Sequence, residues 1–171
     1  MENYVLLKKS TELENLKLGF TKTYFADDLL VLVSGTKKEV LKKTKDAKKE
    51  SKLVIFRPST EEMLRFALEK TNIDLILGSE LINPKDSVHF ARSGLDQITC
   101  KIAAQKNKII GFSFDDVLKS KNKSQLIARI SLNLRLCKKY KVKTKFFSDI
   151  HSQQDLAAFS RVLQKQRNIY K

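Results

Sequence analysis

Short apolar runs alternate along the chain with longer polar stretches. Each run has the length and the β-branched or aromatic content of a strand buried in a sheet. The strand candidates are residues 4–7, 29–33, 53–56, 75–77, 109–112 and 144–147, with residues 23–25 as a weaker seventh. The stretches between them are mostly long enough for helices, so the pattern predicts strands that alternate with helices.

A hydroxyl side chain followed three residues later by an acid comes after most of these runs. At that spacing the hydroxyl accepts from the third residue's N–H, while the acid accepts from the first residue's N–H, which is the capping box of a helix start. The pairs are Thr11/Glu14, Thr36/Glu39, Ser59/Glu62, Ser93/Asp96, Ser113/Asp116 and Ser152/Asp155. Because they come in phase with the apolar runs, they predict a series of strand–loop–helix units.

Such a series predicts an α/β fold with a mainly parallel sheet covered by helices. Six or seven strands in 171 residues suit a small (βα)n barrel of the TIM type, closed or incomplete, and an open parallel sheet is the alternative. Because 42% of the residues are hydrophobic, we expect one domain, residues 1–171, with its own core.

Residues 124–140 are predicted to form a helix with two apolar faces. The main face, at helical spacing, holds Leu126, Ile127, Ile130, Leu134 and Cys137. Leu132 and Leu136 lie nearly opposite this face. They either pack under a neighbouring helix or bind a partner protein.

The net positive charge of the chain indicates which classes of partner it attracts. The chain has 34 Lys and Arg against 19 Asp and Glu, a formal net charge of +15, which attracts nucleic acid, acidic protein or anionic lipid. No apolar stretch approaches the ~20 residues that span a bilayer, so we expect no membrane. Cys100 and Cys137 lack a metal-binding or redox spacing, which predicts reduced thiols and a cytoplasmic location, with a disulfide between the two as the alternative.

In a parallel sheet the loops that follow the strands gather at one edge. The N-termini of the next helices also lie there, and their unpaired N–H groups favour phosphate. The side chains this edge would collect are Lys8, Lys9, Arg57, His89, Arg92, Asp149 and His151. They form either a rim that contacts RNA or phosphate, or a set of ordinary loop charges.

The sequence does not have the patterns of an independent enzyme. A zinc or two-metal site needs three or more converging ligands, yet His89 and His151 are the only imidazoles. There is no Gly-x-Ser-x-Gly and no Gly-rich phosphate loop. A magnesium site of carboxylates alone, such as the Asp pairs at 27–28 and 115–116, is the metal alternative. The strands also lack the aromatic motifs of an RRM, so any RNA would be bound mainly through its phosphates.

Residues 86–163 contain five short segments whose residues and order together resemble those of a known protein family. They are Arg92-Ser-Gly-Leu-Asp-Gln-Ile-Thr-Cys-Lys-Ile-Ala, Ile110-Gly-Phe-Ser-Phe-Asp-Asp-Val-Leu, Leu134-Arg-Leu-Cys-Lys-Lys-Tyr-Lys-Val, Phe147-Ser-Asp-Ile-His-Ser and Asp155-Leu-Ala-Ala-Phe. The ordered set resembles protein component 3 of archaeal and eukaryotic ribonuclease P. Residues 1–85 match that family only in their strand–helix rhythm. Ile150 stands where the family's Ser-Asp-Ala-His has alanine, and the metal-binding histidine pair of related hydrolases is absent after the first strand.

The resemblance implies an α/β barrel similar to the polymerase-and-histidinol-phosphatase superfamily and a role in removing the 5′ leader from precursor tRNA. In that enzyme an RNA subunit with magnesium performs the cleavage, so this chain would need no cofactor and no catalytic or metal-binding residues of its own. The implied partners are the ribonuclease P RNA, precursor tRNA, protein component 2 by direct contact, and components 1 and 4 in the holoenzyme.

We therefore predict a non-catalytic subunit that binds RNA phosphates. The RNA-binding candidates are Arg57, His89, Arg92, Lys101, Arg129, Arg135 and Lys138. Leu132 and Leu136 are candidates for partner binding, while Asp149 and His151 are expected to hold the loop after the last strand or to lie near RNA. One rival is a metal-dependent phosphoesterase on the same barrel that depends on His151. The other is a pure protein-interaction scaffold.

Overall fold

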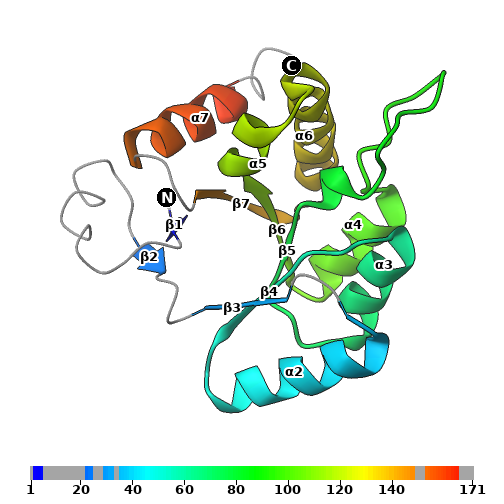
Figure 1. Ribbon diagram of the computed structural model, residues 1–171, viewed down its shortest axis with the longest axis vertical. Helices are drawn as coiled ribbons and strands as arrows, with labels where there is room; N and C mark the ends of the chain where they lie inside the picture. The colour runs from blue at the N-terminus through cyan, green and yellow to red at the C-terminus, as the bar shows by residue number, and fades with distance from the viewer. Residues whose placement is uncertain (1, 6–21, 25–28, 33–34, 149–152, 166–171) are drawn as a thin grey trace.

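The structure is a computed structural model that describes residues 2–5, 22–24, 29–32, 35–148 and 153–165 of the chain (Figure 1). Among these residues, seven strands form one sheet in which every pairing is parallel. The strands are β1 (Glu2–Val5), β2 (Lys22–Tyr24), β3 (Leu29–Leu32), β4 (Leu53–Phe56), β5 (Leu75–Leu77), β6 (Ile109–Ser113) and β7 (Lys143–Ser148). All seven strand candidates are confirmed, with β1 beginning two residues before the predicted run.

Helices connect most of the strands and lie around the outside of them (Figure 1). They are α2 (Lys37–Lys49), α3 (Glu61–Lys70), α4 (Gln97–Gln105), α5 (Phe114–Lys119), α6 (Lys123–Lys139) and α7 (Gln153–Lys165), with a short 3-10 helix, η3 (Ser79–Leu81). The sheet order is β2-β1-β7-β6-β5-β4-β3. The predicted α/β class with a parallel sheet is therefore confirmed.

Two of the predicted helix starts occur as expected. Thr36 and Glu39 form a full capping box at the start of α2. Ser113 caps α5 by accepting a hydrogen bond from the backbone N–H of Asp116. The pairs at 11/14 and 152/155 involve residues outside the described part of the chain.

Two predicted helix starts are wrong. α3 is capped by Thr60 instead of Ser59, which leaves two acids in the first turn, where the helix dipole favours negative charge. α4 is capped by Asp96 instead of Ser93. The intervening Gly94 has a φ of +81°, so the backbone turns there and the helix begins after it.

Side chains alternate between the two faces of the sheet. Val54 and Phe56 of β4 face the main core, which the helices cover, whereas Ile55 packs with Leu75, Leu77 and Phe147 in a smaller cluster on the other face. The main face of α6 is buried as predicted, from Leu126 to Cys137. Gly111 allows the second cluster to close, because a Cβ there would lie 2.7 Å from the ring of Phe147.

Three helices end in the same turn. Ser51, Asn107 and Lys141 follow α2, α4 and α6 and have φ values of 56°, 52° and 58°. In each case the next residue's N–H donates to a carbonyl five residues back, as in Val142 to Cys137 at 2.8 Å, which is the Schellman motif. These turns deliver the chain to the start of a strand, and we call this side of the sheet the helix-to-strand edge. The opposite side, where strands end, is the strand-to-helix edge.

No helix of the described residues is long and apolar enough to span a bilayer. The thiols of Cys100 and Cys137 are buried, and the hydrogen bond between them lowers the pKa of Cys100.

Candidate nucleic-acid interface

At the strand-to-helix edge, most charged side chains near the sheet are held by protein groups. Arg57, directly after β4, forms an ion pair with Asp116 in the first turn of α5. Both side chains are more than half buried. Arg57 therefore joins two loops of this edge, as a structural charge would.

Loop 82–95, between η3 and α4, is anchored by a buried arginine of α6. The guanidinium of Arg129 donates through Nε to Asp86 at 2.9 Å and through Nη1 to the carbonyl oxygens of Glu80 and Asn83 at 3.0 and 2.6 Å. Arg129 is only 4% exposed. Its place in the structure is thus that of a loop anchor, and its donors are directed at the protein instead of at a phosphate.

The carboxylate of Asp86 completes this anchor. The side chain of Gln125 and the backbone N–H of Arg92 both donate to it. These hydrogen bonds, followed by those from Arg129, lower the pKa of Asp86 to about 2. Because the folded pKa is depressed, the stabilisation is present above the usual pKa of 3.8 and is lost as the pH falls from there through 2.

The other end of the loop closes against η3. A Cβ on Gly94 would lie 1.9 Å from the carbonyl oxygen of Ser79, so only glycine allows this approach. The Asn133 amide, buried in α6, donates to the Ser93 carbonyl at 2.8 Å. The Ser-Gly pair singled out in the sequence is therefore where the loop returns to the body of the protein.

Glu80 is a fully buried carboxyl in η3. The hydroxyl of Ser79 donates to Oε2 of Glu80 at 3.3 Å. The other carboxyl oxygen of Glu80, Oε1, has no hydrogen-bond partner among the described residues. Burial, reinforced by the charge of Asp116, raises the pKa of Glu80 to about 7. The group is therefore largely protonated in mildly acidic solution.

We expect Glu80→Gln to remove a pH dependence of stability. In the wild type the folded pKa is raised from 4.5 to about 7, so stabilisation present below pH 4.5 is lost as the pH rises to 7, about 3 kcal/mol in all. The variant should show no such fall when the free energy of unfolding in urea is measured from pH 5 to 8. The exposed Glu62→Gln is the control, and a wild-type curve that is flat across this range would contradict the prediction.

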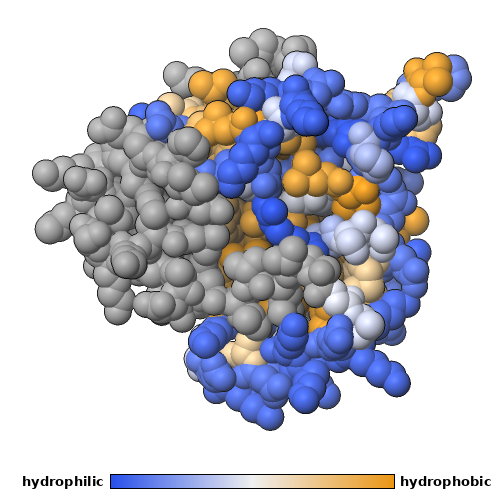
Figure 2. Space-filling model, in the orientation of Figure 1, coloured by the Kyte–Doolittle hydropathy of each residue, from blue (hydrophilic) through white to orange (hydrophobic). Residues whose placement is uncertain are grey.

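The tip of loop 82–95 projects from the body at the upper right (Figure 1). Val88 is 95% exposed and Phe90 62% exposed, with exposed His89 between them. The hydropathy view shows this apolar tip (Figure 2). His89 therefore lies far out on the loop, apart from Arg57.

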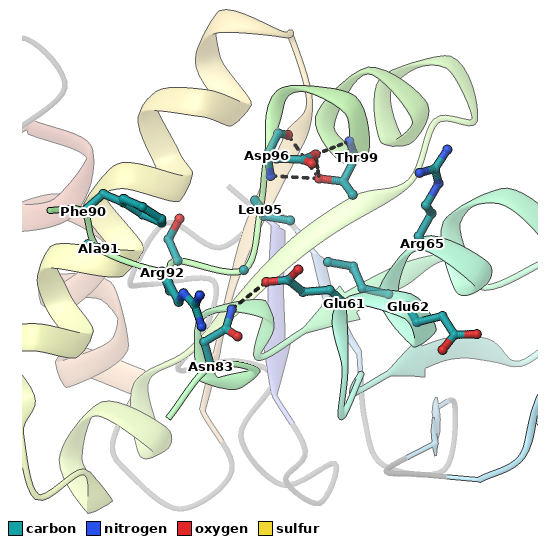
Figure 3. Close-up of a pocket in the computed structure, with 13 residues that line it drawn as sticks. Glu61, Glu62, Arg65, Asn83, Phe90, Ala91, Arg92, Leu95, Asp96 and Thr99 are labelled. Carbon is teal, nitrogen blue, oxygen red and sulfur yellow. Dashed lines mark hydrogen bonds between the residues drawn. The ribbon is translucent and has the colours of Figure 1, made fainter. Parts of the chain in front are cut away.

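A pocket of about 760 Å³ lies between this loop and the starts of α3 and α4 (Figure 3). Exposed Arg92 lines it together with Phe90, but so do Glu61 and Glu62. Glu61 accepts a hydrogen bond from Asn83 across the pocket at 2.8 Å. The pocket thus has mixed charge, which does not select a polyanion.

The two edges of the sheet differ in charge. The strand-to-helix segments 35–39, 57–62, 78–96 and 114–116 hold eight acids and five bases. The helix-to-strand segments 46–52, 69–74, 105–108 and 138–143 hold ten lysines and four acids. The positive charge among the described segments therefore lies at the edge opposite the one that the sequence interpretation selected.

This asymmetry has a signal in the sequence that lies in the charge pattern and not in any motif. Residues 97–148 hold 13 Lys and Arg but only Asp115 and Asp116 as acids, so this stretch carries +11 of the net charge of +15. A count of charge along the chain finds the stretch. Only the fold shows that many of its lysines share one edge.

The remaining predicted residues lie on the helices. Lys101 of α4 is exposed, with its Nζ 5.9 Å from the centre of the Tyr140 ring, and Arg135 and Lys138 are exposed on α6. Leu136 packs against the main core and Leu132 is partly buried, so these two do not form an exposed patch. Lys8, Lys9, Asp149 and His151 lie outside the described residues, and their predicted roles stay predictions.

Among the described residues, no group of three or more His, Cys, Asp or Glu side chains could hold a metal ion. This statement covers Asp115 and Asp116 but not the pair at 27–28, which lies outside the described part.

Comparison with protein-family models and with curated proteins found no match for the sequence. Comparison with solved structures found the same fold in a chain of the cryo-EM structure of archaeal ribonuclease P with mature tRNA. The TM-score is 0.69 at 19% identity, over 94% of this chain and 73% of that one. A crystal structure of an uncharacterized protein is also similar, with a TM-score of 0.56 at 10% identity, over 81% of this chain and 39% of the other.

Proposed function

We propose that this chain is an RNA-binding protein subunit of a ribonuclease P. The observation that carries the proposal is the shared fold over 94% of the chain with a chain of an archaeal ribonuclease P. The +11 charge of residues 97–148 supports it, because a subunit that folds a large RNA must neutralise phosphates. The five segments between residues 86 and 163 favour protein component 3 as the particular subunit.

In this role the chain assists a catalytic RNA that removes the 5′ leader from precursor tRNA in the cytoplasm. It contacts protein component 2 directly and works with components 1 and 4. Magnesium belongs to the RNA, and the chain itself breaks no bond. The charge of residues 97–148 and the ordered segments favour this role over a phosphoesterase or a pure protein scaffold.

We also infer that the sheet is an incomplete barrel. β1 pairs with both β2 and β7, so the first strand closes onto the last, as in a barrel. Every strand pairs with its neighbours in chain order, except that no pairing joins β2 to β3 among the described residues. This order suits a small (βα)n barrel that is open at one position.

Reconstitution tests the proposed function. The full chain, added to a ribonuclease P RNA and its other proteins at limiting magnesium, is expected to raise the rate of precursor-tRNA cleavage at least about tenfold over the same mixture without it, because phosphate neutralisation changes RNA affinity by orders of magnitude. A mixture with the chain but without the RNA should not cleave.

Two outcomes would overturn the proposal. Unchanged cleavage when the chain is added would remove it from ribonuclease P. Phosphoester hydrolysis by the chain alone with a divalent metal would make it a phosphoesterase, and loss of that activity in His151→Ala would support that rival further.

A further inference from the structure

Five exposed lysines cluster on two neighbouring turns of the helix-to-strand edge. Lys106 belongs to the turn between α4 and β6, and the turn between α6 and β7 contributes the others. They are Lys106, Lys138, Lys139, Lys141 and Lys143, and we call them the lysine face. The two turns lie side by side because Ile109, the first residue of β6, pairs with Lys143, the first residue of β7.

Four of the other five lysines of this edge have structural partners, namely Lys48, Lys49, Lys52 and Lys108. The fifth, Lys70, is the last residue of α3 and does not belong to the two turns of the face. Lys108 donates to the carbonyl oxygens of Thr71 and Ile73 at 3.2 and 2.6 Å, and its partial burial lowers its pKa. Lys48 forms an ion pair with Asp74, which also accepts from the N–H of Val54. These contacts tie the turn before β5 to its neighbours.

The lysine face has no such structural partners. None of its five ammonium groups forms an ion pair with a carboxylate of the described residues. The negative end of a helix dipole stabilises a lysine in the last turn by only about 0.3–1 kcal/mol, and the neighbouring like charges oppose one another. Ion pairing with the described carboxylates therefore does not account for five lysines in this place.

The side chains around Tyr140 give the face a defined arrangement. The Nζ atoms of Lys101 and Lys139 lie 5.9 and 5.7 Å from the centre of the Tyr140 ring, within the range of cation–π attraction. The Tyr140 hydroxyl lies 3.3 Å from Oε1 of Gln97, which joins α4 to the end of α6. The ring thus orients one lysine of the face relative to α4.

The chemistry of the face distinguishes RNA from a protein partner. Protein interfaces have an apolar centre and are depleted in lysine. The large exposed hydrophobic side chains of the described residues are Leu81, Val88, Phe90, Ile98 and Val162. None of them belongs to the two turns, so the face offers ammonium groups without an apolar centre, as phosphate contacts require.

We propose that the lysine face is the surface through which this chain binds RNA phosphates, and that the strand-to-helix edge is not. This assignment rests on the proposed function and specifies its site. The ligand is the sugar–phosphate backbone of a structured RNA, bound without reading its bases.

Two triple variants with equal loss of charge test the assignment. Lys106→Gln, Lys139→Gln and Lys143→Gln together remove three charges from the face. Lys38→Gln, Lys42→Gln and Lys45→Gln remove three from the exposed side of α2, where none has an ion pair with a described residue. Lys141 is left in place because its φ of 58° would complicate the comparison. The measurement is the affinity of the full chain for a precursor-tRNA transcript and for the ribonuclease P RNA, as a function of KCl concentration.

The face variant is expected to bind RNA at least about tenfold more weakly than wild type at 100 mM KCl. The slope of log affinity against log salt should become shallower by about 2, because each of the three lost phosphate contacts contributes about 0.7–0.9 to that slope. The α2 variant should stay close to wild type. Urea unfolding should show the face variant as stable as wild type or more so, because repulsion is relieved.

Equal losses in the two variants would overturn the lysine face, while RNA binding by the wild type would leave the proposed function standing. Unchanged RNA affinity in the face variant would also overturn the assignment of the lysine face to RNA, even if that variant lost a contact with another protein subunit. Absence of any salt-dependent RNA binding by the wild type, together with no stimulation in the reconstitution, would remove both proposals.

Discussion

Arg129→Met is expected to lower the free energy of unfolding by about 3–5 kcal/mol, as is usual when one partner of a buried ion pair is removed. Methionine fills much of the space, but it leaves Asp86 without its charge partner and two carbonyl oxygens of loop 82–95 without a donor. Since whole domains have a stability of only about 5–15 kcal/mol, the loss should be visible directly in urea or thermal unfolding.

Lys138→Met, exposed on the same helix, is the control and should change stability by less than about 0.5 kcal/mol. A cycle that adds Asp86→Asn should show strong coupling with Arg129→Met and none with Lys138→Met. A loss below about 1 kcal/mol in Arg129→Met would mean that the guanidinium is not the anchor of the loop. It would also restore Arg129 as a candidate for direct RNA contact.

Gly94→Ala is expected to destabilise the protein by about 3 kcal/mol. The φ of +81° costs an alanine roughly 1–2 kcal/mol, and the collision with the Ser79 carbonyl oxygen adds about 1–3 kcal/mol because backbone must move. This backbone movement would also displace the end of loop 82–95, next to Arg92.

Gly78→Ala separates these two contributions. Gly78 has a φ of +78°, nearly the same as Gly94, but a Cβ there would meet only the Leu81 side chain, at 3.6 Å. This variant should lose only the conformational part, about 1–2 kcal/mol, in the same unfolding experiment. Equal losses at the two positions would show that the approach of Gly94 to Ser79 contributes nothing.

The strands could be predicted because each is a local pattern. Buried parallel strands are continuous apolar runs, so segments such as Leu53–Phe56 and Leu75–Leu77 are recognisable without knowing their neighbours. The capping box of α2 is equally local, since Thr36 and Glu39 bond only to each other's backbone. The α4 start was misplaced because Gly94 turns the backbone first, and the reason for that turn is a contact with Ser79, fifteen positions earlier.

The surroundings of the candidate site residues could not be predicted, because the groups that contact each charge come from other segments of the chain. Arg129 has the sequence context of a surface residue on an amphipathic helix, but the loop after β5 folds over it. In the sequence Arg57 looks like an exposed loop charge. In the structure it forms an ion pair with Asp116, which lies after β6, two strands further along the chain. Both pairings join residues more than forty positions apart, so no local pattern contains them.

The sequence by itself determined the alternation of strands and helices, the parallel sheet and the concentration of positive charge in residues 97–148. Tertiary structure decided which of those charges are exposed together. Lys106 and Lys143 become neighbours only because β6 and β7 pair in register, and Lys108 becomes structural only because two carbonyl oxygens of the preceding turn face it. The physical reason is that a charge is assigned its role by the groups within a few ångströms of it, and in a parallel sheet most of those groups come from distant parts of the chain.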